Sequence, residues 1–566
     1  MGQASVLHGM TPWMRSPVVI QSDKKRLHSA FTRVGKLRPA FPRSQNFISA
    51  MYSTIVLSVL VAALVLASRR FNLLSRVLTF YLKWREPITS VDGRQNLPTL
   101  PFVWPNGQGN VEKYLHGREN SVRWGAEYGS IYRIWSGFHG EMQVSYPCHG
   151  SDSLLTCVSI LTNPTDIETV FRDSHTHIKA SANDSGHYMY QLLGVCLGLV
   201  SKKEWQSLRK ATEAPFTRMA STTYVEHVLE EASKHVAGLM ENKLSKKWLL
   251  HPAADLRIYP FLALAGILYG ELTADLKRRL IDIIPGRDSV FAHMIRGGVT
   301  RYTWASHLPI TANREMRTFK EAWGKWNDDA HAEALRRGQA APIIDMYSHL
   351  ARGTITREAL LQTLDEMLFA NLDVTIGALA WTFVFIAAYP RVQTRLLSEI
   401  KNASVDPDTN KAYLMSQSNY LHHILLEGSR LRPVAAFSVA QACPTARQVG
   451  AFYLPAGSKF VVDAHALNVR DPVWAPDNTA FRPERWAEGG VQRAKDVRYC
   501  YWRFGFGPRV CLGKYVVDLM MKAIVVEVVT KWEVKLEDDH GDKWKWDEET
   551  WSLPANLRIA CVKRMS

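Results

Sequence analysis

The chain has 566 residues, of which 46% are hydrophobic and 22% are charged. These ordinary globular values exclude a disordered chain, a collagen-like or low-complexity protein and a membrane protein with many spans. The formal net charge is +16, and a basic protein suits an anionic partner such as an anionic lipid or an acidic protein. Because no nucleic-acid-reading module accompanies the charge, we expect no nucleic-acid partner.

Residues 1–46 form a basic tail that is poor in acidic residues, a composition typical of targeting segments. Residues 47–67 follow without a single charged side chain. About 20 apolar residues span a bilayer, so we predict a transmembrane anchor here; a cleaved signal peptide and a buried core helix are the alternatives. The basic residues that come next predict a cytosolic body. Met51 is a second possible start besides Met1, and a start there would remove the tail.

Residues 68–105 are basic at first and then rich in proline. Prolines in an irregular run indicate a stiff linker, which would hold the body at a set distance from the bilayer. Residues 106–566 form the body. Strand-like pieces occur at 130–134 and 158–161, helical patterns follow to about residue 430, and short strands with turns are predicted over 434–464.

The longest helical pattern runs from about Arg357 to Ala388, and its middle is apolar almost all round. Such a helix is buried on all sides. Asn371, Asp373 and Thr375 interrupt the apolar run. A carboxylate in a buried helix is costly unless it is partnered or neutralised. Asp373 is therefore either a satisfied structural carboxylate or a group that handles protons beside a ligand.

The seven cysteines include no C-x-x-C pair, which argues against a structural zinc site, a dithiol redox motif and a disulfide scaffold. One of them, Cys511, lies in the run FGFGPRVCLG over 504–513. The glycines and the proline predict a tight loop whose backbone can approach a flat ligand. Cys511 begins a helical pattern, where the helix dipole stabilises a thiolate. Arg509 suits an anionic group such as a haem propionate, and the thiolate suits axial ligation of haem iron.

This run matches the signature F-x-x-G-x-R-x-C-x-G and resembles the cytochrome P450 family in its membrane-anchored eukaryotic form. The resemblance implies a mainly α fold with a small β region, behind one N-terminal transmembrane helix. It also implies haem b as the cofactor, with Cys511 as the axial ligand of the iron. The remaining fixed positions of the signature are assigned to cofactor binding: Phe504, Gly507, Arg509 and Gly513.

Three further patterns occur in the order typical of the family. Glu427 and Arg430 resemble its E-x-x-R motif, and FRPERW over 481–486 resembles F-x-P-E-R-F. The resemblance implies that Glu427, Arg430 and Arg485 form a structural salt-bridge network. A second E-x-x-R spacing at Glu333 lies too far ahead of the cysteine loop. Trp205 and Arg209 resemble the W-x-x-x-R helix, where positions i and i+4 share a face and could reach one propionate.

The buried helix departs from the family pattern [AG]-G-x-[DE]-T, because residues 370–375 are ANLDVT. Asp373 keeps the acid, Asn371 replaces the glycine and Val374 replaces the alcohol. Each residue turns a helix by about 100°, so Thr375 cannot simply replace that alcohol. Asn371 and Thr375 share a face and could hold a water together. We therefore expect Asp373 to relay protons, directly or through a water positioned by Thr375 and Asn371. This variant resembles fungal specialised-metabolism members.

The predicted function is haem-thiolate monooxygenation of a lipophilic small molecule in the biosynthesis of a specialised metabolite. Electrons would come from a separate NADPH-cytochrome reductase, because only 55 residues follow Cys511. The resemblance implies the endoplasmic reticulum membrane, with a single pass and a cytosolic catalytic domain. Oxidative coupling or ring closure without net oxygen insertion is the alternative reaction, and a non-catalytic haem sensor is the alternative class.

Overall fold

The computed structural model describes most of the chain beyond residue 72 and little before it. Contacts divide the chain into two units, Met1–Phe71 and Asn72–Ser566. In the first unit only residues 55–59 and 66 are described, and they are helical. The predicted tail over 1–46 and most of the predicted anchor over 47–67 lie outside the described residues. In the second unit the described ranges are 73–85, 87–103, 107–138, 155–179, 185–241, 247–403, 406–488, 497–537, 553–554 and 557–564.

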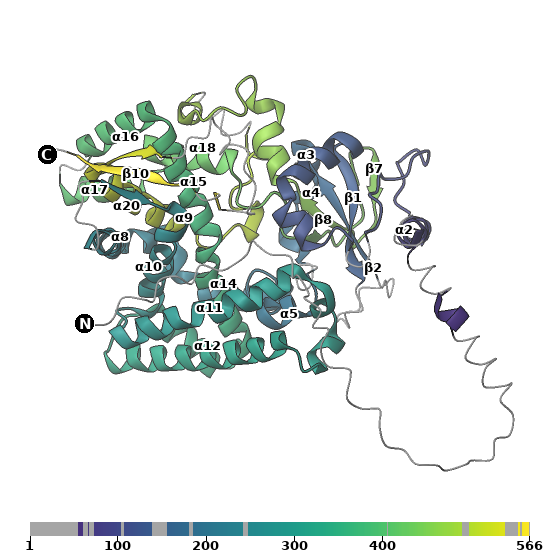
Figure 1. Cartoon of the computed structure of the whole chain (residues 1–566), viewed down its shortest axis with the longest axis horizontal. Coiled ribbons are helices and arrows are strands. Elements are labelled where there is room, and N and C mark those ends of the chain that lie inside the picture. The colour runs from purple at the N-terminus through teal and green to yellow at the C-terminus, as the bar shows by residue number, and fades with distance from the viewer. Residues whose placement is uncertain are drawn as a thin grey trace, which may run out of the picture. The chain divides into compact units, whose positions relative to one another are not determined.

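The second unit is mainly helical, as the sequence predicts. Its α-helices are α2 (Leu73–Arg85), α3 (Gly117–Tyr128), α4 (Pro164–Phe171), α5 (His187–Leu193), α6 (Lys202–Thr212), α7 (Arg218–Thr223), α8 (Val225–Glu241), α9 (Pro252–Asp255), α10 (Ile258–Tyr269), α11 (Ala274–Arg296), α12 (Thr311–Arg336), α13 (Pro342–Ala351), α14 (Arg357–Phe369), α15 (Val374–Ala388), α16 (Pro390–Ala403), α17 (Pro407–Met415), α18 (Tyr420–Leu431) and α20 (Lys514–Lys531). Figure 1 shows most of them gathered on one side of the unit, with α3 and α4 against a sheet on the other.

The largest sheet has five strands in the order β1-β2-β8-β5-β3. The strands are β1 (Ile131–Phe138), β2 (Leu155–Leu161), β8 (Lys459–Val462), β5 (Gln441–Ala442) and β3 (Ile178–Lys179). The first two are antiparallel, with Ile134 opposite Val158. A parallel pairing of β2 with β8, with Ile160 opposite Val461, joins the early strands to the late part of the chain. The sheet therefore brings Lys179, at its edge, into the same body as the C-terminal third.

Two smaller sheets complete the β region. One has the order β4-β10-β9, with β4 at Lys247–Leu250, β10 at Ile559–Lys563 and β9 at Trp532–Leu536. The other is the hairpin of β6 (Arg447–Val449) and β7 (Phe452–Leu454). The strands predicted over 434–464 are thus present as four short pieces. The pairing of β9 with β10 fastens the C-terminus to the strand that follows α20.

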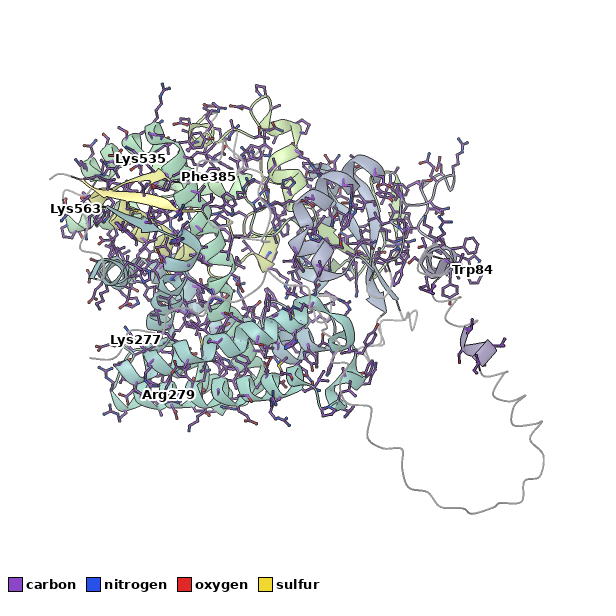
Figure 2. All side chains as sticks on the ribbon, viewed as in Figure 1. Trp84, Lys277, Arg279, Phe385, Lys535 and Lys563 are labelled. Carbon is purple, nitrogen blue, oxygen red and sulfur yellow. The ribbon has the colours of Figure 1, made fainter. Side chains whose placement is uncertain are left out.

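The helix predicted from Arg357 to Ala388 forms the centre of the body, in two parts. Thr356 caps α14, because its hydroxyl accepts the Ala359 N–H at 3.1 Å. A 3₁₀ turn, η7 (Ala370–Leu372), separates α14 from α15. Almost every side chain of α15 is buried, and Phe385 stacks on Phe481 with ring centroids 4.4 Å apart; Figure 2 labels Phe385 inside the body. Among the described helices, only the stretch over 357–388 is long and apolar enough to cross a membrane, and it is mostly buried in the core.

Residues 97–102, in the proline-rich part of the predicted linker, are packed against the body. Leu97, Leu100 and Phe102 are buried, and the Phe102 N–H donates to the Thr79 hydroxyl of α2 at 2.7 Å. The Leu100 N–H also donates to the Arg133 carbonyl of β1 at 2.9 Å. The prolines thus shape an extended segment that packs on the sheet. The compact body begins near residue 72 and not near the predicted boundary at 106.

Candidate active site

The cysteine loop is closed by its own backbone. The Cys511 N–H donates to the Phe504 carbonyl at 2.9 Å, and a 3₁₀ turn, η11 (Gly507–Arg509), lies between them. Gly507 has a φ of +71°, and a Cβ there would lie 2.0 Å from the Ser174 hydroxyl oxygen. Only glycine fits this position without strain and collision. Gly507 itself does not line the neighbouring cavity; it shapes the loop, and its assignment to cofactor binding stays a prediction.

A cavity of about 570 Å³ opens beside this loop, and Cys511, Phe504, Arg509 and Gly513 line it. Cys511 is the exposed one of the five free cysteines described, and it is exposed towards the cavity; the other four are buried. Burial of the site from bulk solvent raises the pKa of the Cys511 thiol, while the Gly513 N–H opposes that rise. The protein alone therefore favours the thiol, contrary to the thiolate expected from the helix dipole. A bound metal cation would reverse that preference.

Cations surround the same cavity. Trp205 and Arg209 of α6 line it together, as their i, i+4 spacing predicts, and the Arg509 guanidinium lies 5.2 Å from the Trp205 ring centroid. Lys179 of β3 also lines it, and burial beside Arg509 lowers its pKa to about 7. Glu366 is the one acidic residue among the described lining. This excess of positive charge suits a ligand with anionic edge groups, and a haem with its propionates fits both the cations and the exposed thiol.

No pattern in the sequence marks Lys179 as a residue of the site. It lies on a strand of two residues, far along the chain from the cysteine loop. Only the sheet pairing brings β3 to the site, where Ser201 accepts the Lys179 backbone N–H at 2.9 Å. The same serine hydroxyl oxygen lies 3.4 Å from the Arg509 guanidinium. The lysine is thus placed beside the predicted propionate-binding arginine by long-range contacts.

Glu366 is a second residue that sequence reasoning missed. It belongs to α14, lines the cavity and accepts the Gly198 N–H at 3.0 Å. Two side chains one turn earlier on α14 make the same kind of contact: Thr363 accepts the Leu197 N–H at 3.1 Å, and Gln362 accepts the Val195 N–H at 2.8 Å. Burial raises the pKa of Glu366, although the Gly198 N–H lowers it. This face of α14 therefore ties the cavity wall at 195–198 to the central helix.

The break between α14 and α15 is held by Asn371. Its side-chain amide donates to the carbonyls of Met367 at 2.7 Å and Leu368 at 3.2 Å. Its side-chain oxygen accepts the Thr375 hydroxyl at 2.7 Å. Both side chains line the cavity, as does Val374. The asparagine thus satisfies backbone carbonyls at the break, and the expected pairing with Thr375 is a direct hydrogen bond.

Asp373 is placed differently from Asn371 and Thr375. It has a non-helical backbone, with φ −123° and ψ −56°, and it does not line the cavity. Burial raises the pKa of its carboxyl, while the charges of Arg257 and Arg287 lower it. Arg257 is paired with Asp288 at 2.8 Å and also donates to the Leu372 carbonyl at 3.4 Å. The carboxyl is therefore associated with charges from other helices, and its part in proton relay stays a prediction.

The three residues predicted to form an ion-pair network are in contact. Glu427 accepts from Arg430 at 2.9 Å and from Arg485 at 2.8 Å, and none of the three side chains is more than 2% exposed. Arg430 also donates to the carbonyls of Asn468 and Asn478. The other E-x-x-R spacing, Glu333 with Arg336, is a surface pair. The network fastens α18 to η10 (Pro483–Trp486) and to the segment that leads to the cysteine loop.

Comparisons with known proteins agree with this geometry. The family model described as Cytochrome P450 matches residues 97–561. The chain is 41% identical over 487 residues to Cytochrome P450 monooxygenase aclC of Aspergillus oryzae, a match that covers 86% of this chain and 95% of that protein. It is 36% identical to Cytochrome P450 monooxygenase asaD of Aspergillus flavus, with 91% and 96% covered. It is 34% identical to Cytochrome P450 monooxygenase gliC of Aspergillus fumigatus, with 90% and 97% covered.

Proposed function

This chain belongs to the cytochrome P450 family and is a cytochrome P450 monooxygenase, and from that premise we propose that it oxidises a lipophilic small molecule in fungal specialised metabolism. The observation that carries the proposal is one cavity lined both by Cys511 and by the Asn371–Thr375 pair. Much of the remaining lining is apolar, including Phe291 and Met294 of α11. An apolar cavity with few polar groups favours a lipophilic substrate.

Haem b is the cofactor that fits the described residues. Cys511 would bind the iron, and Arg509, Arg209 and Trp205 would hold the propionates, joined by Lys179. Phe504 and Gly513 line the cavity next to Cys511, where a flat macrocycle needs the backbone to come close. When it is bound through a thiolate, haem supplies the activation of O₂ for insertion of an oxygen atom into the substrate.

Asn371 and Thr375, which line the cavity, and Asp373, which does not, would manage protons together. The raised pKa of the Asp373 carboxyl lets it take up a proton more readily than an exposed aspartate does. We expect it to pass that proton to a water held by the Thr375 hydroxyl and the Asn371 side chain. Val374 lines the cavity but offers no hydrogen bond. Asn371 and Thr375 together would therefore hold the proton-transferring water, a role that belongs to the alcohol next to the acid elsewhere in the family.

Electrons would come from a separate NADPH-dependent reductase. One face of α6 supplies Trp205 and Arg209 to the cavity, while Lys202, Lys203 and Lys210 of the same helix are exposed. A basic surface so close to the cofactor site suits an acidic flavoprotein domain. We expect reversal of these three lysine charges to slow the first electron transfer and to make it less sensitive to salt.

The protein would be anchored by residues 47–67 in the endoplasmic reticulum membrane, with a single pass and a cytosolic body. Support comes from α2, which begins shortly after this segment and exposes Phe80 and Trp84 at 76% and 73%; Figure 2 labels Trp84 at the outer side of α2. Large apolar side chains on an amphipathic helix suit the bilayer interface. Release from host membranes by salt alone would contradict the anchor. N-terminal sequencing of the native protein distinguishes Met1 from Met51.

Two measurements test the proposed function. The purified ferrous protein should show the thiolate-haem carbon monoxide spectrum; Cys511→Ala should abolish it and Val374→Thr should leave it intact. A normal spectrum in the alanine variant would overturn the assignment of Cys511. Metabolites of the native host should then be compared with and without the gene. A precursor that accumulates one oxygen lighter than the missing product supports monooxygenation, whereas a missing product two hydrogens lighter than its precursor would identify coupling or ring closure.

A further inference from the structure

Two residues that flank the cysteine loop in the sequence form an ion pair with little exposure. Arg503 precedes Cys511 by eight residues and Asp518 follows it by seven. The two side chains form a bidentate pair, with nitrogen–oxygen distances of 2.5 and 3.2 Å. Their side chains are only 10% and 11% exposed. Neither residue belongs to the cysteine signature or to the other motifs of the sequence.

The pair is rigidly connected to the loop that carries Cys511. Arg503 precedes Phe504, whose carbonyl accepts the Cys511 N–H at 2.9 Å. The Arg503 guanidinium lies 4.4 Å from the Phe504 ring centroid, and its Nε lies 3.3 Å from the Ser429 hydroxyl of α18. Arg503 also lines the same cavity as Cys511. Contacts with Phe504, Ser429 and Asp518 therefore hold the guanidinium at the wall of the cavity that Cys511 also lines.

The surroundings leave this charge pair little screened. Lys522, one turn further along α20, is buried and donates to the carbonyls of Leu414 and Ser416. His422 lies 3.9 Å from the Asp518 carboxylate, but burial lowers its pKa to about 3, so it is neutral at physiological pH. With Lys522, the pair therefore forms a group of one carboxylate, Asp518, and two cations, Arg503 and Lys522. Water cannot compensate them as it does on the surface, so each acts strongly on neighbouring charge.

We propose that the Arg503–Asp518 pair sets the reduction potential of the haem held by Cys511, an inference that rests on the proposed function. One-electron reduction by an external donor makes the iron–thiolate unit more negative by one charge. A fixed cation beside that unit stabilises the reduced form and raises the potential, while a fixed anion lowers it. Arg503 and Asp518 therefore act in opposite directions. Both act by their charge on the iron–thiolate unit and take no part in bond making.

The test uses four single variants of the full-length, haem-loaded protein. Arg503→Gln should lower the midpoint potential and Asp518→Asn should raise it, each changing the ferrous-to-ferric ratio at a fixed potential at least threefold. A tenfold change in that ratio corresponds to ~59 mV for one electron. The controls are Glu527→Gln and Lys531→Gln, an ion pair of the same helix in which the lysine is about half exposed. Both controls should stay within experimental error of the unmodified protein. Midpoints are measured by dye-mediated spectroelectrochemical titration.

The double variant Arg503→Gln with Asp518→Asn separates charge from packing. It removes a cation and an anion together, so its midpoint should lie between those of the two single variants. Shifts of both single variants in the same direction, or shifts no larger than the controls, overturn the inference. If Arg503→Gln does not retain haem, Asp518→Asn decides alone, because it must raise the potential. An unmodified protein without the thiolate-haem carbon monoxide spectrum would instead refute the proposed function, so the two failures are distinguishable.

Discussion

Replacing Glu427 by glutamine should destabilise the protein more than any other change in its ion-pair network. The carboxylate is fully buried and accepts hydrogen bonds from two guanidinium groups, from the Trp486 indole N–H at 3.0 Å and from the Arg482 backbone N–H at 3.1 Å. Glutamine keeps the size of the side chain but removes its charge. Two buried cations, Arg430 and Arg485, would then remain with no buried anion between them.

The expected loss follows from that imbalance. Removing one partner of a buried ion pair costs about 3–5 kcal/mol, a large part of the ~5–15 kcal/mol that holds a native protein together. Arg485→Gln should cost less, about 1.5–3 kcal/mol for lost charged hydrogen bonds, because Glu427 and Arg430 remain a neutral pair. The network thus predicts an order of stabilities and not only a loss.

Urea unfolding, followed by tryptophan fluorescence, measures the order. The matched control is Glu333→Gln, which breaks the other E-x-x-R pair of the chain. That pair lies on the surface of α12 with Arg336 71% exposed, and surface pairs contribute little, so its urea midpoint should not move. The reasoning would be refuted if Glu427→Gln unfolded at the same urea concentration as Glu333→Gln, or if Arg485→Gln were the less stable of the two network variants.

Three further predictions concern the loop, the central helix and acid stability. Gly507→Ala should abolish the thiolate-haem spectrum, because a Cβ at this position would lie 2.0 Å from the Ser174 hydroxyl oxygen. Gly505 also has a positive φ, but a Cβ there would lie 3.7 Å from its nearest neighbour, so Gly505→Ala should lose less of the spectrum. Ser174→Gly should partly restore the spectrum of Gly507→Ala. Thr375→Val should lower the product formed per NADPH consumed and raise peroxide, whereas Thr382→Val, a buried threonine of the same helix outside the cavity, should change neither. Burial lowers the pKa of His422 to about 3. Between about pH 6.5 and pH 3 this histidine is therefore protonated in the unfolded chain but neutral in the folded chain, so the free energy of unfolding falls as the pH drops through this range. His422→Gln should flatten that fall by up to about 1.4 kcal/mol per pH unit; parallel pH profiles would contradict this.

Short contiguous motifs and helical spacing predicted the cysteine loop, the buried central helix and two residue pairs without any tertiary information. The ten residues over 504–513 contain both the proposed iron ligand and the glycines that shape its loop, so the cysteine site could be predicted from one short run. The all-round apolar pattern over 357–388 predicted the buried central helix, since such a helix has no face that could meet water. Asn371 with Thr375, and Glu427 with Arg430, are close because helical spacing alone brings them together.

Only the tertiary structure decided which distant residues share the site. Lys179, Glu366 and the Arg503–Asp518 pair are joined to it by sheet pairing and helix packing, which no local spacing encodes. The same holds for Asp373: the sequence places it on the central helix, but its non-helical backbone and the nearby charges of Arg257 and Arg287 come from the packed body. The prolines over 97–102 predicted a linker, but the apolar side chains of this stretch are buried against the body. Local sequence specifies which conformations and charges are available, whereas burial and electrostatic partnership depend on the whole packed body.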